Sequence, residues 1–189
     1  MKKLDTDRVL SISAMVIGLS SLFVVVYQTY LERTSQRAAV MPYLTVAMHA
    51  NDRYVGLALS NVGLGPALVE EVRVRYRGRD INADPYDFFL QERPGVFTEA
   101  LSVDKIQPGR LLPAGTTSVM LSVESDAAEA RDRMTTELLQ LFDIAEVPRS
   151  WYAKAGVTAG EKAVFEVTYS SVFGQRWRIR SNQLVPERP

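Results

Sequence analysis

A long uncharged segment near the N-terminus constrains this chain more than any other feature. Residues 9–31 contain no charged side chain, and the run is bounded by Arg8 and Glu32. As an α-helix these residues rise about 34 Å, which is enough to cross the roughly 30 Å hydrocarbon core of a bilayer. We therefore predict a single transmembrane helix over residues 9–31, preceded by a cytoplasmic segment over residues 1–8.

A cleaved signal peptide is the alternative, since the segment is N-terminal and follows basic residues. Its apolar stretch is longer than that of a signal peptide, and residues 31–40 provide no good small-x-small cleavage site before Pro42. We therefore expect an uncleaved anchor. Three basic side chains precede the span, against Arg33 and Arg37 just after it, which favours a cytoplasmic N-terminus. The larger C-terminal part is then periplasmic or extracellular, held at the inner or plasma membrane.

Small side chains recur along one stripe of the predicted helix, at Ser11, Ala14, Gly18 and Ser21. Steps of three and four residues place them on one face, where a second transmembrane helix can approach closely. Small residues are also common in membrane spans that lack such a contact. The stripe is therefore a candidate surface for a homo-oligomer or for a partner helix.

The composition excludes several classes of chemistry. Lysine plus arginine and aspartate plus glutamate both number 22, so bulk charge gives no reason to expect nucleic acid as a partner. The chain has no cysteine and one histidine, His49, which we interpret as a surface or packing residue beside a turn. Disulfides, thiol catalysis, the usual catalytic triads and multi-histidine metal sites are therefore excluded. We expect no catalytic residue, cofactor, metal or small-molecule substrate.

Alternating apolar and polar residues predict that the rest of the chain is mainly β-structure. The segments YLTVAMHA and YVGLALSN flank residues 51–53, Asn-Asp-Arg, which predicts a hairpin whose turn residues tolerate the left-handed region. Further alternation predicts a strand in LVEEVRVRYRG and two shorter strands around the Pro-Ala-Gly turn at residues 113–115. A final hairpin in AVFEVTYSSVFGQRWRIRS is expected to turn near Gly174.

Two helices are expected to interrupt these strands. Asp84 followed by Pro85 predicts the N-cap and first residue of a short helix near residues 84–91. Ser125 is expected to cap a longer helix near residues 126–145, where apolar residues repeat at three and four. The expected fold is mainly β: a transmembrane helix plus an antiparallel sandwich of about seven strands over residues 42–185. A polar neck at residues 32–41 joins the two, and residues 186–189 form a tail.

Residues 57–78, LALSNVGLGPALVEEVRVRYRG, resemble part of the Ig-like β-sandwich modules of bacterial surface and envelope proteins, including the cell-adhesion-related kind. In those modules a strand ends in Asn-x-Gly, a small-residue turn with Gly, Pro and Ala follows, and the next strand continues to a glycine. The ending VTYSSVFGQRWRIR is similar to the last hairpin of many single-pass bacterial proteins with such a domain. The resemblance implies a role in adhesion or assembly and transfers no active site. Its matching positions are Asn61, Gly63, Gly65, Pro66 and Ala67.

The same segment, NVGLGPA, is explained physically as a structural turn. Glycine permits positive φ, the Asn61 side chain can bond its own backbone, and Pro66 fixes φ and withholds a donor. A phosphate-binding loop would instead need a following helix and a Lys-Ser/Thr pair, which this segment lacks.

Arginines alternate with apolar residues in two predicted strands and form the leading candidate for a binding surface. If these strands are neighbours in one sheet, their guanidinium groups share a face suited to carboxylates and phosphates. Its expected ligand is an anionic lipid headgroup, an acidic partner or an anionic envelope polymer. The alternative is a solvated face whose arginines pair with Glu70, Glu71 or Glu166. The arginines are Arg73, Arg75, Arg77 and Arg79 on one strand and Arg176, Arg178 and Arg180 on the other.

Two weaker candidates remain. Asp84, Asp87 and Glu92 lie close in sequence, but their spacing matches no calcium-binding loop, and acidic residues favour a helix N-terminus in any case. Trp151 and Tyr152 are amphipathic rings that either touch the bilayer interface or a partner, or fold back onto the sandwich.

These observations lead to one expected function and two alternatives. We expect a non-enzymatic, single-pass membrane protein whose extracytoplasmic domain binds a partner protein or scaffolds an envelope component. The first alternative is a regulatory or signalling subunit with its domain in the cytoplasm and its arginine face on an anionic partner. The second is a hydrolase that uses the carboxylates of residues 84–92, which no nucleophile and base accompany.

Overall fold

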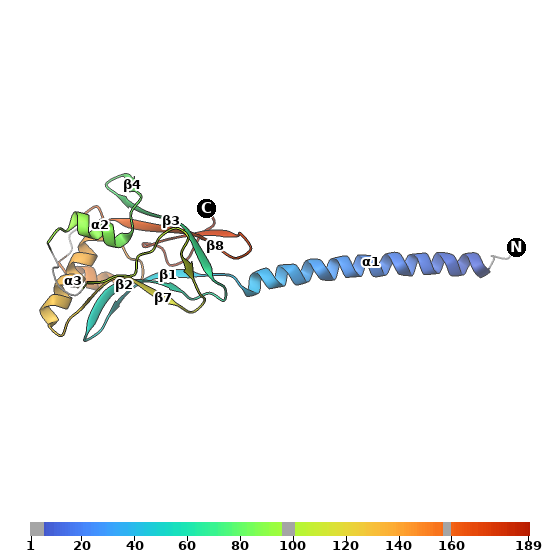
Figure 1. Cartoon of the computed structure of the whole chain (residues 1–189), viewed down its shortest axis with the longest axis horizontal. Helices are drawn as coiled ribbons and strands as arrows, with labels where there is room; N and C mark the ends of the chain where they lie inside the picture. Colours follow the sequence, from blue (N-terminus) through green and yellow to red (C-terminus); the bar gives the residue numbers. More distant parts are fainter. Residues whose placement is uncertain (1–5, 96–100, 157–159) are drawn as a thin grey trace. The chain divides into compact units, whose positions relative to one another are not determined.

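The computed structural model describes residues 6–95, 101–156 and 160–189. The chain divides into two units, residues 1–39 and 40–189. The first is an apolar helix, and the second is a domain of antiparallel β-sheets with short helices between strands (Figure 1).

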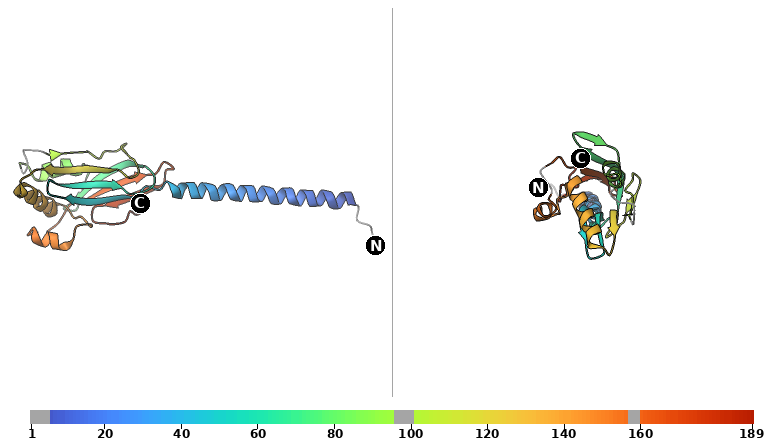
Figure 2. Two further views of the ribbon diagram at one scale, coloured as in Figure 1. Left: turned by 90° about the horizontal axis from the view of Figure 1, so that it is seen from below. Right: turned by 90° about the vertical axis from the view of Figure 1, so that its left-hand side faces the viewer.

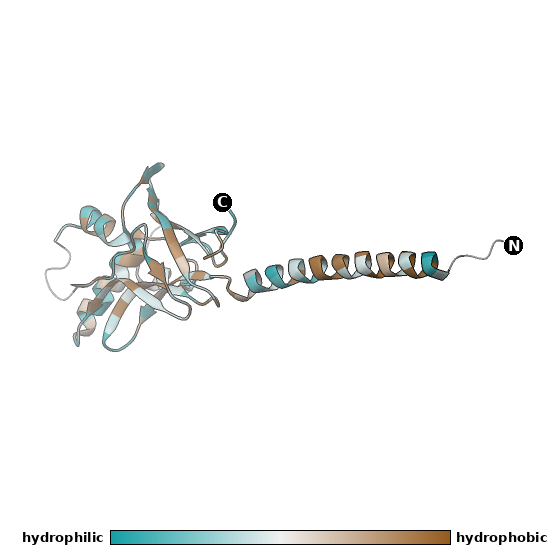
Figure 3. Ribbon diagram, turned by 45° about the vertical axis from the view of Figure 1, so that its right-hand side comes forward, coloured by the Kyte–Doolittle hydropathy of each residue, from teal (hydrophilic) through white to brown (hydrophobic). Residues whose placement is uncertain are grey.

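Helix α1 extends over Thr6–Ala39. Its stretch from Thr6 to Gln36 is long and apolar enough to cross a membrane, and none of it is buried. The hydropathy colouring shows the apolar part of this helix with polar residues towards both of its ends (Figure 3). An N-terminal signal sequence shares these features of length and composition. The predicted polar neck is helical as far as Ala39, and the helix ends before Pro42, which cannot continue it.

The domain contains two antiparallel sheets. The first has the strand order β1-β2-β7-β5, with β1 at Leu44–Ala50, β2 at Tyr54–Asn61, β7 at Thr117–Glu124 and β5 at Leu101–Ser102. The second has the order β4-β3-β8-β9, with β4 at Arg79–Ile81, β3 at Ala67–Tyr76, β8 at Val164–Ser170 and β9 at Arg176–Arg180. The short strand β6, Leu111–Leu112, pairs with the start of β3.

Both sheets bury one face in a common apolar core, as the predicted alternation requires. Leu57 and Leu59 of β2, Val74 of β3, and Phe165 and Val167 of β8 are fully buried. Tyr169 of β8 connects the two sheets, because its hydroxyl accepts a hydrogen bond from the backbone N–H of Leu44 at 3.3 Å. The views along and across the strands show the two sheets and the helices beyond their ends (Figure 2).

Three helices lie between strands in the described part of the domain, and Figure 1 shows the first two on the side of the domain opposite the start of β1. Helix α2, Pro85–Glu92, begins as predicted: the Asp84 side chain accepts a hydrogen bond from the backbone N–H of Tyr86 at 2.8 Å. Helix α3 covers Ala128–Leu141, and helix α4 covers Arg149–Lys154. The sequence did not predict α4.

The prediction for the longer helix was wrong at both ends. Its N-cap is Ala127, which makes no side-chain cap, and the Ser125 hydroxyl instead accepts a hydrogen bond from the Ala127 N–H. The helix ends at Leu141 because Phe142 forms a parallel bridge to Ala163. The apolar periodicity continues past this point, but the backbone leaves the helix to pair with the strand edge.

Both predicted turns are present, and the structure adds details that the local pattern does not give. The Pro-Ala-Gly turn at residues 113–115 lies between two strands, β6 and β7, as predicted. These strands belong to different sheets, because β6 pairs with β3 and β7 pairs with β2. In the β1–β2 turn, none of the described residues 51–53 has positive φ. The Asn51 side chain closes that turn by accepting hydrogen bonds from the backbone N–H groups of Arg53 and Tyr54, each at 2.8 Å.

Candidate functional site

The arginines predicted to share one face occupy three strands and a turn of the second sheet. Strand β3 ends at Tyr76, so Arg77 lies in the following turn and Arg79 lies on β4. The placement of all four on one strand was therefore wrong. Strand β9 is also not the neighbour of β3, because β8 lies between them. The sequence signal for the extra strand is the Arg77-Gly78 pair between two runs of extended residues. Both residues have positive φ and form the turn that joins β3 to β4.

Glu166 on β8 lies at the centre of this face. The register places it between Arg73 on β3 and Arg180 on β9. Its Oε2 atom accepts a hydrogen bond from Arg180 Nε at 2.8 Å and lies 3.6 Å from Arg178 Nε. The Glu166 side chain is only 15% exposed, so this carboxylate joins two arginines away from most of the solvent.

Glu187 adds a second carboxylate to the same two arginines. It accepts hydrogen bonds from Arg178 Nη2 at 2.8 Å and lies 2.9 Å from Arg180 Nη1. The hydrogen bond from Arg178 lowers the pKa of the Glu187 carboxyl below its ordinary value. Two backbone hydrogen bonds between Arg178 and Glu187 attach this C-terminal segment to β9. The sequence pattern predicts only a tail at residues 186–189, because a single bridge leaves no periodic pattern.

A β-bulge places two consecutive glutamates on the arginine face. The register of β3 against β8 shifts between Val69 and Glu71. A bulge sets two residues of one strand opposite a single residue of its partner, so both side chains become available on one side. Glu71 then accepts a hydrogen bond from Arg73 Nε at 2.7 Å, and Glu70 accepts one from Arg176 Nε at 2.6 Å.

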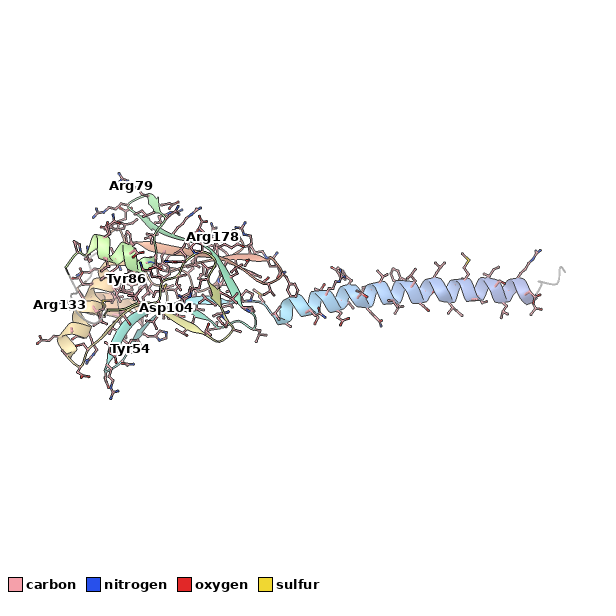
Figure 4. All side chains as sticks on the ribbon, viewed as in Figure 1. Tyr54, Arg79, Tyr86, Asp104, Arg133 and Arg178 are labelled. Atoms are coloured by element: carbon pink, nitrogen blue, oxygen red, sulfur yellow. The ribbon has the colours of Figure 1, made fainter. Side chains whose placement is uncertain are left out.

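The β3–β4 hairpin carries the remaining arginines. Arg75 donates to both oxygens of Asp80 across the hairpin, at 2.7 and 3.2 Å, and this hydrogen bonding lowers the pKa of the Asp80 carboxyl. The guanidinium of Arg77 lies 4.8 Å from the centroid of the Tyr76 ring. Arg79 is exposed at the end of the hairpin and has no ion pair with any described residue (Figure 4).

The arginine face is therefore an ordered set of ion pairs, which we call the arginine ladder. Its end at the β3–β4 hairpin carries positive charge that has no carboxylate partner among the described residues. Five of its seven arginines pair with five carboxylates, which are Glu70, Glu71, Asp80, Glu166 and Glu187. Pairing fixes the guanidinium planes of the ladder, and the charge without a carboxylate partner lies at Arg77 and Arg79. Such an arrangement can bind an acidic segment by its hairpin end without gathering anions over the whole sheet.

The predicted acidic group serves local structure. Asp84 is buried, and its second oxygen accepts a hydrogen bond from the backbone N–H of Ile106 at 2.7 Å. Burial raises the pKa of the Asp84 carboxyl, against the opposing effect of its backbone hydrogen bonds. Asp87 forms an ion pair with Lys105 at 2.7 Å. Among the residues that the structure describes, no group of three or more carboxylates and histidines is placed to hold a metal ion. His49 is exposed on β1.

The two aromatic residues of α4 have different roles. The Tyr152 hydroxyl accepts from the Ile144 N–H at 2.9 Å and donates to the Ile144 carbonyl at 3.1 Å, with Lys162 Nζ 3.5 Å from the ring centroid. Tyr152 therefore folds back onto the domain. Trp151 is 40% exposed and lines a groove of about 480 Å³ between α3, α4 and the β1–β2 turn.

The Asn61 turn is built by side-chain hydrogen bonding and close approach. Asn61 is buried, and its carbonyl oxygen accepts from the N–H groups of Tyr43 and Gly63 at 3.2 and 3.1 Å. Its amide donates to the carbonyls of Gly65, Leu112 and Pro113 at 2.9 to 3.2 Å. The expectation of positive φ was wrong, because Gly63 and Gly65 are absent from the positive-φ glycines of the described chain. These glycines, followed by Pro66, instead let the turn lie against the backbone of residues 40–43.

The small residues of α1 are available for contact with another helix. The Ser11 hydroxyl donates to the backbone carbonyl of Asp7 at 2.8 Å, so its polarity is satisfied within the helix. A Cβ added at Gly18 meets no atom within 4 Å. Ala14 and Ser21 are likewise exposed.

Comparison of the chain with protein-family models, with curated proteins and with solved structures returned no match.

Proposed function

We propose that the chain is a single-pass membrane protein whose C-terminal domain is a non-catalytic binding or scaffolding module for a partner protein or envelope component. One observation carries the proposal: α1 has an apolar stretch with none of its residues buried, while the domain buries a complete core of its own. An apolar helix without protein cover is stable in a bilayer. A domain that needs nothing from that helix for its core is free to work as a tethered head.

The strand order supports an Ig-like sandwich for this head. In Ig domains one sheet has the order A-B-E-D and the other contains C-F-G, extended by C′ in larger forms. The orders β1-β2-β7-β5 and β4-β3-β8-β9 correspond to A-B-E-D and C′-C-F-G when the strands are taken along the chain. Helices α2, α3 and α4 are additions between strands, and β6 pairs alongside β3. An experimentally determined structure of the domain tests this assignment.

The binding role is supported by the structural contacts that the candidate catalytic carboxylates and most of the arginines already make. Asp84 and Asp87 are engaged by a helix cap and a lysine, and the arginine ladder is mostly neutralised by carboxylates. The exposed cations at Arg77 and Arg79 project from one hairpin. We infer that this hairpin contacts an acidic segment of the partner, since exposed arginines recognise carboxylates with defined geometry.

Two measurements test the anchor and its orientation. Alkaline carbonate should leave the intact protein in the membrane pellet, and release into the supernatant would contradict a spanning helix. Because the chain has no cysteine, an Asp52→Cys variant offers one reactive thiol on the domain. Labelling of intact cells by an impermeant maleimide is the expected result. Protection until the cells are lysed would instead support the regulatory alternative, with the domain in the cytoplasm.

Site-specific photocrosslinking tests the binding surface. A benzoyl-phenylalanine residue in place of Arg79, in the full chain in its native membrane, should form a discrete adduct that weakens when Arg77→Glu is added. The same group in place of Asp126, an exposed residue before α3, is the matched control. Adducts of equal yield at both positions, or none at Arg79, would contradict a partner at the hairpin. Sedimentation of the soluble domain, without α1, with anionic liposomes separately tests lipid headgroups as the ligand. An Arg75→Glu, Arg77→Glu, Arg178→Glu variant should lose this sedimentation, and equal sedimentation of variant and parent rejects lipid as the ligand.

A further inference from the structure

Exposed apolar side chains gather at the end of the domain where the chain leaves α1. Leu64 is 75% exposed, Val172 is 62% exposed and Phe173 is 48% exposed. Scattered single exposed apolar residues are ordinary on a protein surface, whereas a group at one place marks an interaction site. We call this group the proximal cluster; its members are Met41, Val62, Leu64, Leu68, Leu111, Val172 and Phe173.

Backbone pairing brings the first part of this cluster together. The N–H of Leu64 donates to the carbonyl of Met41 at 3.0 Å, and the N–H of Val62 donates to the carbonyl of Tyr43 at 2.9 Å. Residues 62–66 therefore lie directly on the first residues of the domain. This contact depends on Gly63 and Gly65, because a Cβ at either position would meet backbone atoms of residues 40–43 at less than 3 Å.

The remaining members join the cluster through the second sheet. Leu68 at the start of β3 lies opposite Leu111 on β6 and opposite Ser170 at the end of β8. Residues 171–175 then turn back into β9, and Val172 and Phe173 lie in that turn. The cluster is thus formed by loops and strand ends that meet at the side of the domain where Val40 begins.

Two arginines next to this cluster in the chain are paired with carboxylates. Arg176 at the start of β9 forms an ion pair with Glu70, and Arg110 forms one with Asp104. The cluster itself contains no ionisable side chain. A surface of this kind favours an apolar or interfacial environment and has little dependence on anionic lipid.

We propose that the proximal cluster docks onto the interfacial layer of the bilayer that α1 spans. The inference rests on the proposed membrane anchor and adds a lipid contact of the domain. Eight helical residues, 32–39, separate the end of the apolar segment from Val40, a path of at most about 12 Å. The polar layer on each side of the hydrocarbon core is about 5–8 Å thick. Val40 is therefore held at most about 7 Å beyond that layer, a gap that a tilted helix closes. Leucine and phenylalanine side chains that reach the layer insert at the acyl boundary.

Spin-label accessibility in the full chain tests this contact. Single cysteines replace Leu64 and Phe173 in the cluster, Asp52 at the opposite end of the domain, and Ile17 in the span. Each variant is labelled with a nitroxide and reconstituted into phosphatidylcholine nanodiscs, and collision with oxygen is compared with collision with a water-soluble nickel chelate. The oxygen-to-nickel ratio at Leu64 and Phe173 should lie above the Asp52 value and below the Ile17 value.

The outcomes separate this inference from the proposed anchor. If Ile17 gives a membrane value while Leu64 and Phe173 match Asp52, the anchor holds and the docking inference is wrong. If Ile17 itself gives the aqueous value, the proposed anchor fails. Low collision with both reagents at Leu64, together with spin–spin broadening between labels, would assign the cluster to a second copy of the chain and overturn lipid docking.

Two further variants show whether the oxygen-to-nickel ratio depends on the apolar side chains of the cluster. Adding Phe173→Asp to the Leu64→Cys chain should lower the oxygen-to-nickel ratio towards the Asp52 value, because a charged residue opposes insertion at the acyl boundary. Adding Arg149→Asp, at an exposed position on α4, should leave the ratio unchanged. An elevated ratio that appears only with anionic lipid would assign the contact to the arginines and overturn the apolar cluster as its cause.

Discussion

A Cβ atom built on Gly65 would lie 1.8 Å from the backbone carbonyl oxygen of Val40. This close approach joins the first residue after α1 to the turn between β2 and β3. The obstruction is backbone, so a side chain at residue 65 cannot be accommodated by a change of rotamer. The turn between β2 and β3 is therefore held against the first residues of the domain by close packing at Gly65 as well as by the hydrogen bonds of Asn61.

Gly65→Ala is expected to destabilise the domain by about 3 kcal/mol, since an added methyl group in a packed site forces backbone displacement. Urea unfolding of the full chain in detergent, followed by the fluorescence of the buried Trp177, measures the effect. Gly18→Ala makes the same chemical change where no atom lies within 4 Å, and it should leave the domain midpoint unchanged. Equal midpoints for both variants would disprove the steric role of Gly65.

Glu166→Gln is expected to reduce the free energy of unfolding by about 1–2 kcal/mol, because the mostly buried Arg178 and Arg180 lose a shared charge partner. Asp80→Asn provides the comparison, since the Arg75–Asp80 pair is largely exposed and pairs of that kind contribute about 0–1 kcal/mol. A double-mutant cycle of Glu166→Gln with Arg180→Gln isolates the pairwise energy. A coupling of zero would show that the ladder contributes nothing to stability.

Tyr169→Phe should cost about 1 kcal/mol near neutral pH by leaving the buried N–H of Leu44 without its acceptor. Burial raises the pKa of Tyr169 to about 12, above the value of about 10 expected in the unfolded chain. Folding therefore favours the protonated phenol, so this stability is complete below pH 10 and declines as pH rises towards 12.

The measurement for Tyr169 is denaturant unfolding of both proteins between pH 8 and pH 11.5. The difference in stability between the parent and Tyr169→Phe should shrink towards the alkaline end. Tyr54→Phe, at a half-buried position on β2, serves as the control. A difference that stays constant over this range would contradict a raised pKa for Tyr169.

Gly18→Leu should weaken association of α1 with another transmembrane helix, because a bulky side chain separates two helices that approach along the small-residue stripe. A membrane two-hybrid assay of α1 against itself measures the loss. Ser20→Leu introduces the same side chain on the opposite face of the helix and should retain the signal. Equal signals for the parent and Gly18→Leu would remove the stripe as a contact surface.

Much of the local structure was predictable because it depends on neighbours along the chain. Strict alternation predicted the strand that contains Val72 and Val74 and the one that contains Trp177, and these three side chains are buried. It did not predict that the first of these strands ends at Tyr76. The Asp84-Pro85 pair predicted the start of α2. The long helix was misplaced because apolar periodicity says nothing about the strand edge that captures Phe142.

The candidate site was predictable in its residue types and in three of its carboxylates, because Glu70, Glu71 and Glu166 pair with arginines as the alternative interpretation expected. Alternation placed Arg178 and Arg180 on a polar strand face, but the two carboxylates that they share come from the middle strand β8 and from the C-terminal segment. The pairing of Glu187 with Arg178 depends on one bridge between residues that local pattern does not connect. The proximal cluster shows the same limit, since its members become a surface only when two sheets meet.

By itself the amino-acid sequence determined the apolar helix, the strand periods and the absence of cysteine chemistry, because these follow from composition and from contacts a few residues apart. Only the tertiary structure decided the strand order, which arginine pairs with which carboxylate, and why residue 65 must be glycine. Those features arise where residues distant along the chain are brought within a few ångströms, and the energy of such contacts leaves no periodic trace in the sequence.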